Sequence, residues 1–265
     1  MLIDTHIHLD AAEYGNGLPS VLDDARCAGL RGFVLPAVEP ANFEVVAQLA
    51  HQHADVVPAF GIHPLYVDRV DDHALDVLRD RLAEGGAIAV GEIGLDYFVE
   101  GVDRERHQRF YEAQLKLARD FDLPVLLHVR RAQDDVLKYL RRIKVRGGIA
   151  HAFNGSRQQA DMFIALGFKL GFGGAMTYSG SSRIRALARE LPLECIVLET
   201  DGPDIPPAWR PQGPSLPAEL HHYAALLAEL RDDSVENVIT QTGGNACEAL
   251  PGLAARIKSG FRPAQ

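Results

Sequence analysis

The feature that most restricts the possible folds is a regular alternation between two kinds of segment. Short runs rich in Val, Ile, Leu and Ala recur along the chain, and longer amphipathic segments separate them. Runs that are apolar on both faces are typical of parallel strands buried under helices. The expected strands are Leu2–His8, Gly32–Val38, Val56–Ile62, Ala87–Ile93, Pro124–Val129, Gly147–Ala152, Phe168–Phe172 and Cys195–Thr200.

The intervening segments place apolar residues at a spacing of three or four, as helices do. They are Leu18–Ala28, Phe43–His53, Asp72–Glu84, Asp103–Phe121, Ala132–Arg142, Arg157–Leu166 and Ser182–Leu191. Eight strands alternating with helices predict an α/β fold with a parallel sheet, and the number favours a closed (β/α)8 TIM barrel. An open doubly wound sheet is the alternative. It would normally have a glycine-rich turn after the first strand, which Leu9–Asn16 is not.

The rest of the chain fits around such a barrel. Gly202–Pro217 contains six prolines and is expected to be a long loop after the last strand. Leu216–Leu230 returns to helical periodicity, and Val235–Leu250 is expected to form a closing pair of helices. A chain of 265 residues suits one barrel. We therefore predict a single domain over residues 1–265, with a loose tail from 256 to 265.

Two histidines two residues apart mark the first expected strand. Side chains at i and i+2 of a strand lie on the same face, so His6 and His8 could both bind one metal ion. They could equally be one hydrogen-bonded and one solvated histidine. The choice depends on what the other strands carry at their ends.

Several other strands also finish with residues of the metal-binding type. In a barrel, the carboxyl ends of all strands face one pocket. Four histidines and two carboxylates exceed the needs of one catalytic zinc, and they suit two divalent ions such as Zn, Mn, Fe, Co or Mg. We predict His6, His8 and Asp201 on one ion, His128 and His151 on the other, and Glu92 between them. Each alone could be a structural strand-end or turn residue, so the prediction rests on the set.

Composition narrows the class of partner. The formal net charge of −9 disfavours a broad basic surface for duplex nucleic acid. Three separated cysteines without a C-x-x-C spacing indicate neither a disulfide framework nor a zinc–cysteine site. No signal peptide and no membrane-spanning apolar run is recognisable. We expect a cytoplasmic protein with no membrane association and no obligate protein partner.

Six ordered motifs resemble the TatD family of metal-dependent hydrolases, within the amidohydrolase-like barrel superfamily. The matching stretches are Ile3–Asp10 (IDTHIHLD), Gly61–Pro64 (GIHP), Val90–Tyr97 (VGEIGLDY), Leu123–Arg130 (LPVLLHVR), His151–Ser156 (HAFNGS) and Leu198–Pro203 (LETDGP). Asn245 resembles the asparagine of the family's C-terminal helix. The resemblance covers residues 3 to about 203 and most of the chain.

The resemblance implies a TIM barrel, a divalent metal centre and hydrolysis of phosphodiesters, typically as a 3′–5′ exonuclease on single-stranded DNA. It carries the same six ligands onto this chain and adds Asp201 as the general base on the attacking water. His63 and Glu199 would contact substrate or orient ligands. One stretch departs from the family pattern: Arg210–Ser215 lacks the asparagine that many members have beside the substrate.

Candidate substrate contacts follow the same strands. Arg130 and Asn154 could meet a phosphate, and Tyr97 or Phe98 could stack on a base. Arg131 precedes Asp134 and Asp135 and is expected on a solvated helix face with these acidic neighbours. The remaining histidines, which include His107, are expected at the surface.

The predicted function is therefore metal-dependent cleavage of phosphodiesters at an end of single-stranded nucleic acid, DNA or RNA. The alternative is that the same centre hydrolyses an ester, lactone or amide, including the ester of aminoacyl-tRNA, because an activated water attacks carbonyl carbon as readily as phosphorus. A non-catalytic binding protein is a further alternative, which the presence of both Glu92 and Asp201 argues against.

Overall fold

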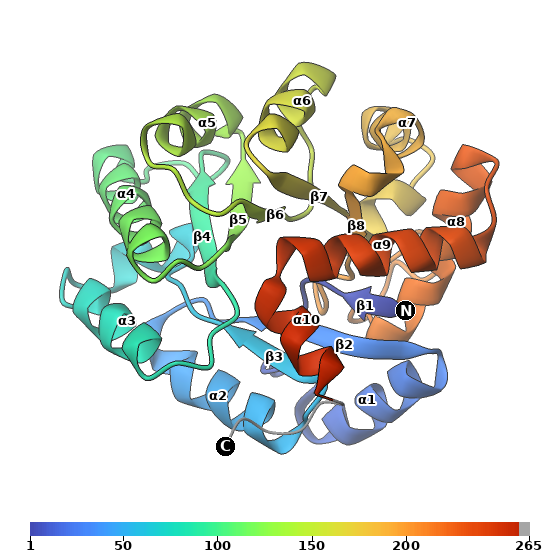
Figure 1. Ribbon diagram of the computed structural model, residues 1–265, viewed down its shortest axis with the longest axis horizontal. Coiled ribbons are helices and arrows are strands. Elements are labelled where there is room, and N and C mark those ends of the chain that lie inside the picture. Colours follow the sequence, from blue (N-terminus) through green and yellow to red (C-terminus); the bar gives the residue numbers. More distant parts are fainter. Residues whose placement is uncertain (260–265) are drawn as a thin grey trace.

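The computed structural model describes residues 1–259 and contains the expected alternation of strands and helices (Figure 1). The strands are β1 (Leu2–Asp4), β2 (Leu30–Pro36), β3 (Val56–Ala59), β4 (Val90–Asp96), β5 (Val125–Arg130), β6 (Gly148–Ala150), β7 (Phe168–Phe172) and β8 (Ile196–Leu198). The helices are α1 (Leu18–Cys27), α2 (Phe43–Gln52), α3 (Ala74–Ala83), α4 (Arg104–Asp120), α5 (Gln133–Arg142), α6 (Arg157–Ala165), α7 (Ser182–Glu190), α8 (Leu220–Arg231), α9 (Val235–Ala249) and α10 (Pro251–Lys258).

All neighbouring strands are parallel. They form two ladders, one of β1, β2 and β3 and one of β4 to β8. Single parallel bridges join the ladders on both sides, Phe60 to Val90 and Ile7 to Gly202. Hydrogen bonds such as Thr5 N–H to Leu198 O (3.1 Å) cross the second seam. This arrangement, with a helix outside each strand in Figure 1, confirms the predicted (β/α)8 barrel fold.

The strand ends differ from the predicted bounds. β1 ends at Asp4, so His6 and His8 lie beyond it, where the chain bonds both to β2, through Ile7 N–H and Val34 O at 3.1 Å, and to the segment after β8. Asp201 N–H donates to His6 O at 2.9 Å, and His8 N–H donates to Gly202 O at 2.8 Å. β4 lies three residues later than expected and ends at Asp96, so Glu92 is inside the strand.

Two expectations for the C-terminus are wrong. Val235–Leu250 is one helix, α9, rather than a pair, and the second helix of the pair is α10 after Pro251. Proline has no N–H to continue a helix but fits its first turn, which places the break at Leu250. The expected tail is helical up to Lys258, and residues 260–265 lie outside the described part.

The barrel interior changes from apolar to polar along its axis. One buried cluster joins the strands to Ala246 of α9, Leu250 between the helices and Leu253 of α10; its strand residues are Ile3, Val34, Val57, Leu126, Ile149 and Val197. In Figure 1 these two helices cross one end of the barrel beside the amino terminus. Two residues further along β5 and β6, Leu126 and Ile149 give way to His128 and His151 on the same face. The amino end is therefore packed with apolar side chains, and the carboxyl end holds the polar ones.

Asn245 of α9 ties the start of β8 to the helix that closes the barrel. Its buried amide Nδ2 donates to Leu193 O at 2.8 Å and to Ile196 O at 2.7 Å. Asn245→Ala would leave both carbonyls without this partner in a buried place, so we expect a loss of about 2–4 kcal/mol in the free energy of unfolding. Urea unfolding measures it, and Asn237→Ala, an exposed asparagine of the same helix, is the control. A loss equal to that of the control would contradict this role.

Within residues 1–259, no helix is both long and apolar enough to cross a bilayer.

Candidate metal centre

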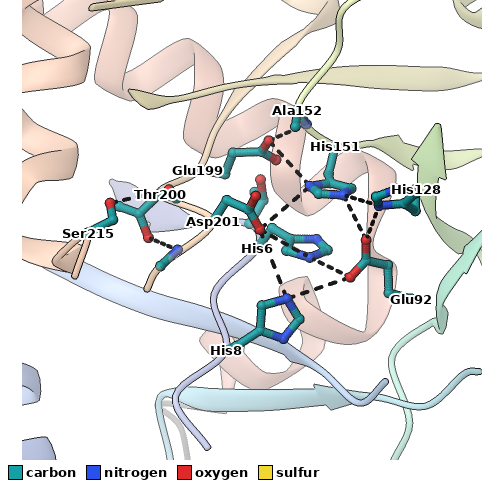
Figure 2. A network of polar contacts seen from close by, with 12 residues as sticks. His6, His8, Glu92, His128, His151, Ala152, Glu199, Thr200, Asp201 and Ser215 are labelled. Carbon is teal, nitrogen blue, oxygen red and sulfur yellow. Dashed lines mark hydrogen bonds and ion pairs between the residues drawn. The ribbon is translucent and has the colours of Figure 1, made fainter. Parts of the chain in front are cut away.

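Glu92 lies at the middle of a ring of histidines, with different histidines beside each carboxylate oxygen (Figure 2). Oε2 is 3.1 Å from His6 Nε2 and 3.6 Å from His8 Nε2. Oε1 is 2.7 Å from His151 Nε2, 3.0 Å from His128 Nδ1 and 3.4 Å from His63 Nε2. A carboxylate with separate nitrogen donors on each oxygen has the arrangement of a ligand that bridges two ions.

The structure brings together all six residues predicted as ligands. Three sets have donor atoms close enough to share one ion: His6, His8 and Asp201; His6, Glu92 and His151; and His63, Glu92 and His128. The first set agrees with the predicted first site. The predicted second site is divided. His63 joins Glu92 and His128, whereas His151 lies with His6 and Glu92, and its ring stacks on that of His6 with 3.9 Å between centroids.

Unpartnered donor atoms show that the residues fit divalent ions. His6 Nδ1, His151 Nδ1 and Glu199 Oε2 are buried and have no hydrogen-bond partner among residues 1–259. Buried polar atoms are almost always satisfied, so such a group of exceptions requires an explanation. Imidazole nitrogens and carboxylate oxygens are the ligands that zinc, manganese and iron accept. The donor set therefore suits divalent metal, although the number and identity of the ions stay a prediction.

Asp96 orients His128, a role that the sequence reasoning missed. Its Oδ2 lies 2.9 Å from His128 Nε2, the nitrogen opposite the one that contacts Glu92. A carboxylate on the second nitrogen of a ligand histidine sets its tautomer and ring direction. The signal was present in the sequence, because Asp96 follows Glu92 by four residues in one strand and an even spacing points both to one face.

Two further acids support the segment after β8. Asp4 accepts from Thr200 N–H at 2.9 Å and from the Thr200 hydroxyl at 2.6 Å. Glu199 is buried, accepts from Ala152 N–H, and lies 3.8 Å from His151 Nδ1. Gly171 on β7 leaves the space for Glu199, because a Cβ there would overlap its carboxylate. Asp201 has φ +54°, an unfavourable region for a non-glycine residue that recurs at functional sites.

The charges of the centre are strongly coupled. Burial alone would raise the pKa of Glu92, but His63, His151 and His6 outweigh it and hold that pKa well below its usual value. Burial and the charge of His151 lower the pKa of His6 to about 3. Burial also disfavours the cation of His151, but Glu92 and Asp201 overcome this and raise its pKa to about 10. In the metal-free protein, these charges favour the protonated form of His151 beside Glu92.

Metal uptake should release this proton. A histidine binds metal through a deprotonated nitrogen, and the raised pKa of His151 keeps it protonated below about pH 10. Protons therefore compete with the ion, and the apparent affinity should rise with pH between about 6 and 9, by up to about tenfold per unit. Calorimetric titration with Zn²⁺ or Mn²⁺ in buffers of different ionisation enthalpy measures the release. Uptake with no proton released and no pH dependence would refute the prediction.

The centre opens into a cavity of about 560 Å³ at the carboxyl ends of the strands. Among the residues expected to meet substrate, His63, Arg130 and Asn154 line it. Glu199 lies buried behind His151. Tyr97 is not among the lining residues, and its hydroxyl donates to Asp135 at 2.9 Å. We therefore assign Tyr97 to holding α5 rather than to the cavity.

The proline-rich loop contributes Asp204 and Ile205 to the cavity wall, whereas Arg210 pairs with Glu219 at 3.2 Å. One histidine expected at the surface is buried instead. His107 is 1% exposed, not at the surface, with Nε2 3.1 Å from Asp68. His107 lies one turn before Phe110 and Tyr111 on the buried face of α4, which packs against the segment after β3.

Comparison with known proteins identifies the family. The family described as "TatD related DNase" matches residues 3–251. The chain belongs to the TatD family. An uncharacterised metal-dependent hydrolase of Escherichia coli K12, YjjV, is 38% identical over 239 residues, which are 89% of this chain and 92% of that protein. The 3′–5′ ssDNA/RNA exonuclease TatD of Erwinia amylovora is 30% identical over 95% of this chain and all of that protein.

The solved structures agree with this membership. The crystal structure of YjjV superimposes with a TM-score of 0.91 at 36% identity, covering 94% of this chain and 98% of that one. The TatD resemblance noted in the sequence motifs is thereby confirmed. As a TatD-family protein, the chain is a metal-dependent hydrolase, in keeping with the cluster around Glu92.

Proposed function

We propose that the chain is a phosphodiesterase with two divalent ions that removes nucleotides from the 3′ end of single-stranded DNA or RNA. The observation that carries the proposal is the position of Glu92, whose two oxygens face separate sets of histidines. Two ions sharing a carboxylate suit in-line displacement at phosphorus, because they can act on the attacking and leaving oxygens together. The family match and the full-length similarity to a named exonuclease support this direction.

The chain's own residues would divide the work around the reacting phosphate. His6, His8, His128, His151, Glu92 and Asp201 would hold the ions, with His63 beside the second. Bound divalent ions would supply Lewis acidity and help to ionise the attacking water. Asp201 would accept the proton of that water, since burial raises the pKa of its carboxyl above the usual value and makes it a stronger base.

Among the permanently charged residues that line the cavity, most would be acidic when substrate enters. Arg130 is the cation among them, and the acids are Glu92, Asp96, Asp201 and Asp204. We place Arg130 on the phosphate next to the reacting one and Asn154 on the opposite wall. Glu199 would act through His151, whose ring it borders.

Digestion of end-labelled oligonucleotides tests the proposal. The protein is stripped with a chelator, reloaded with Mg²⁺, Mn²⁺ or Zn²⁺, and given 3′-labelled and 5′-labelled single strands. Stepwise shortening from the 3′ end that needs metal is the expected result. Failure to cleave with any ion, while binding of the ion is demonstrated by calorimetry, would refute it.

A second candidate is hydrolysis of a carboxylic ester, lactone or amide. The observation in its favour is that Arg130 is the sole lysine or arginine among the described cavity-lining residues, which is little cationic charge for a polyanion. A panel of ester, lactone and amide substrates under the same metals, including an aminoacyl-tRNA ester, separates it from the first candidate.

A further inference from the structure

An exposed aromatic side chain follows the carboxyl end of β4. Phe98 is 44% exposed, and its N–H donates to Asp96 Oδ1 at 2.8 Å. The other oxygen of this carboxylate contacts His128. One buried carboxylate therefore fixes both a candidate ligand histidine and the backbone of Phe98.

Two arginines at the end of β5 lie over the ring of Phe98. Arg130 Cζ is 3.6 Å from the ring centroid, and Arg131 Cζ is 4.6 Å from it. A guanidinium within about 6 Å of an aromatic centroid is attracted to the ring. The backbone also holds the two segments side by side, because Tyr97 N–H, next to Phe98, donates to Arg130 O at 2.8 Å. Phe98 thus gathers two positive charges, and one of them belongs to a residue of the cavity wall.

The acids near Arg131 are engaged elsewhere. Asp134 accepts from Gln159 at 2.9 Å, and Asp135 accepts from Tyr97 at 2.9 Å. Arg131 is exposed just before the acids of α5, as expected, but within residues 1–259 neither Arg130 nor Arg131 has a carboxylate within ion-pair distance. Arg130 is the register partner of Asp96 on β4, whose pKa its charge helps to lower, but it forms no ion pair there. In a chain of net charge −9, two adjacent arginines without an ion pair and held by one ring are available to an anion from outside.

We infer that Arg130, Phe98 and Arg131 form a cationic platform that binds the sugar–phosphate chain of the substrate beyond the scissile linkage. This inference rests on the proposed function, because it takes the reacting phosphodiester to lie at Glu92. Arginine binds phosphate through its paired N–H groups, and its planar face can also carry a stacked base. The platform would therefore favour a polymer over a substrate with a single phosphodiester.

Binding of a fluorescent single-stranded oligothymidylate of about eight nucleotides to the metal-loaded protein tests the platform. Phosphorothioate linkages slow its hydrolysis, and anisotropy gives Kd at several salt concentrations. For Arg131→Gln we expect Kd to rise about tenfold and the slope of log K against log salt to fall by about one. Phe98→Leu should raise Kd because both arginines lose the ring that holds them. Arg131→Lys keeps the charge, so the slope of log K against log salt should match the wild type.

Arg119→Gln is the matched control, because it removes the same charge from an exposed arginine near the C-terminal end of α4. Equal Kd values for Arg131→Gln, Phe98→Leu and this control would overturn the platform. Turnover provides a second readout. The ratio of kcat/KM for the oligonucleotide to kcat/KM for bis(4-nitrophenyl) phosphate should fall about tenfold in Arg131→Gln.

The two proposals can fail separately. A wild-type protein that cleaves neither substrate with any metal refutes the phosphodiesterase, and the anisotropy series still decides the platform. The platform alone is refuted if the wild type cleaves bis(4-nitrophenyl) phosphate but its Kd for the oligonucleotide equals that of Arg131→Gln.

Discussion

Glu92→Gln should reduce turnover by about a thousandfold or more while the protein stays folded. The amide keeps the shape of the side chain but loses the negative charge that five histidine nitrogens surround within 3.6 Å. The proposed shared ligand of two ions would thereby be lost, and the amide N–H₂ group would face histidine nitrogens. We expect the metal content to fall from two ions towards one or none.

Steady-state rates with the best oligonucleotide or model diester, together with metal analysis of the purified variant, measure these effects. Glu84→Gln is the control, since Glu84 is an exposed glutamate at the end of α3. The circular dichroism spectra of both variants should match the wild type. Near-normal turnover by Glu92→Gln with two ions bound would rule out the bridging role.

Asp201→Asn should reduce turnover by about a thousandfold, with a smaller effect on metal content. An asparagine can still offer one oxygen to an ion, but it cannot accept the proton of the attacking water. The carboxylate lies near three histidines, His6 at 3.8 Å, His151 at 3.9 Å and His8 at 4.0 Å. The set of His6, His8 and Asp201 therefore weakens as well. A large loss of kcat with little change in KM would separate the loss of the base from a loss of substrate binding.

The pH dependence of kcat distinguishes a general base from a residue that only supports the structure. If Asp201 is the base, the acidic limb of the kcat profile in the wild type should be lost in Asp201→Asn. Asp120→Asn, an exposed residue at the end of α4, should keep both the rate and the limb. A residual rate above about a tenth of wild type would exclude Asp201 as the general base.

The barrel could be predicted because its determinants are local. The strand-length apolar runs and the amphipathic segments between them are set by side-chain periodicity, which needs no knowledge of distant contacts. Once strands are parallel and alternate with helices, their carboxyl ends must lie at one face, so His6, His128 and His151 could be placed together before any coordinates. The bounds were less accurate, since β1 and β8 end where contacts across the seam replace the ladder.

The C-terminal region shows what periodicity misses. Nothing local in α9 distinguishes one helix from two, and its double glycine favours a break. Gly243 is tolerated because the backbone of Met1 passes so close that a side chain would not fit. That contact joins the two ends of the chain, and only the folded barrel creates it.

The sequence by itself determined the fold class, the family and the face that carries the metal-type residues, because strand order and side-chain alternation follow from neighbours along the chain. Only the tertiary structure decided which histidine lies at which oxygen of Glu92, that His63 joins the second set, and that Asp96 orients His128. It also turned Tyr97 away from the cavity and gathered Arg130 and Arg131 on Phe98. These arrangements depend on distances between side chains from different strands, and packing in three dimensions sets those distances.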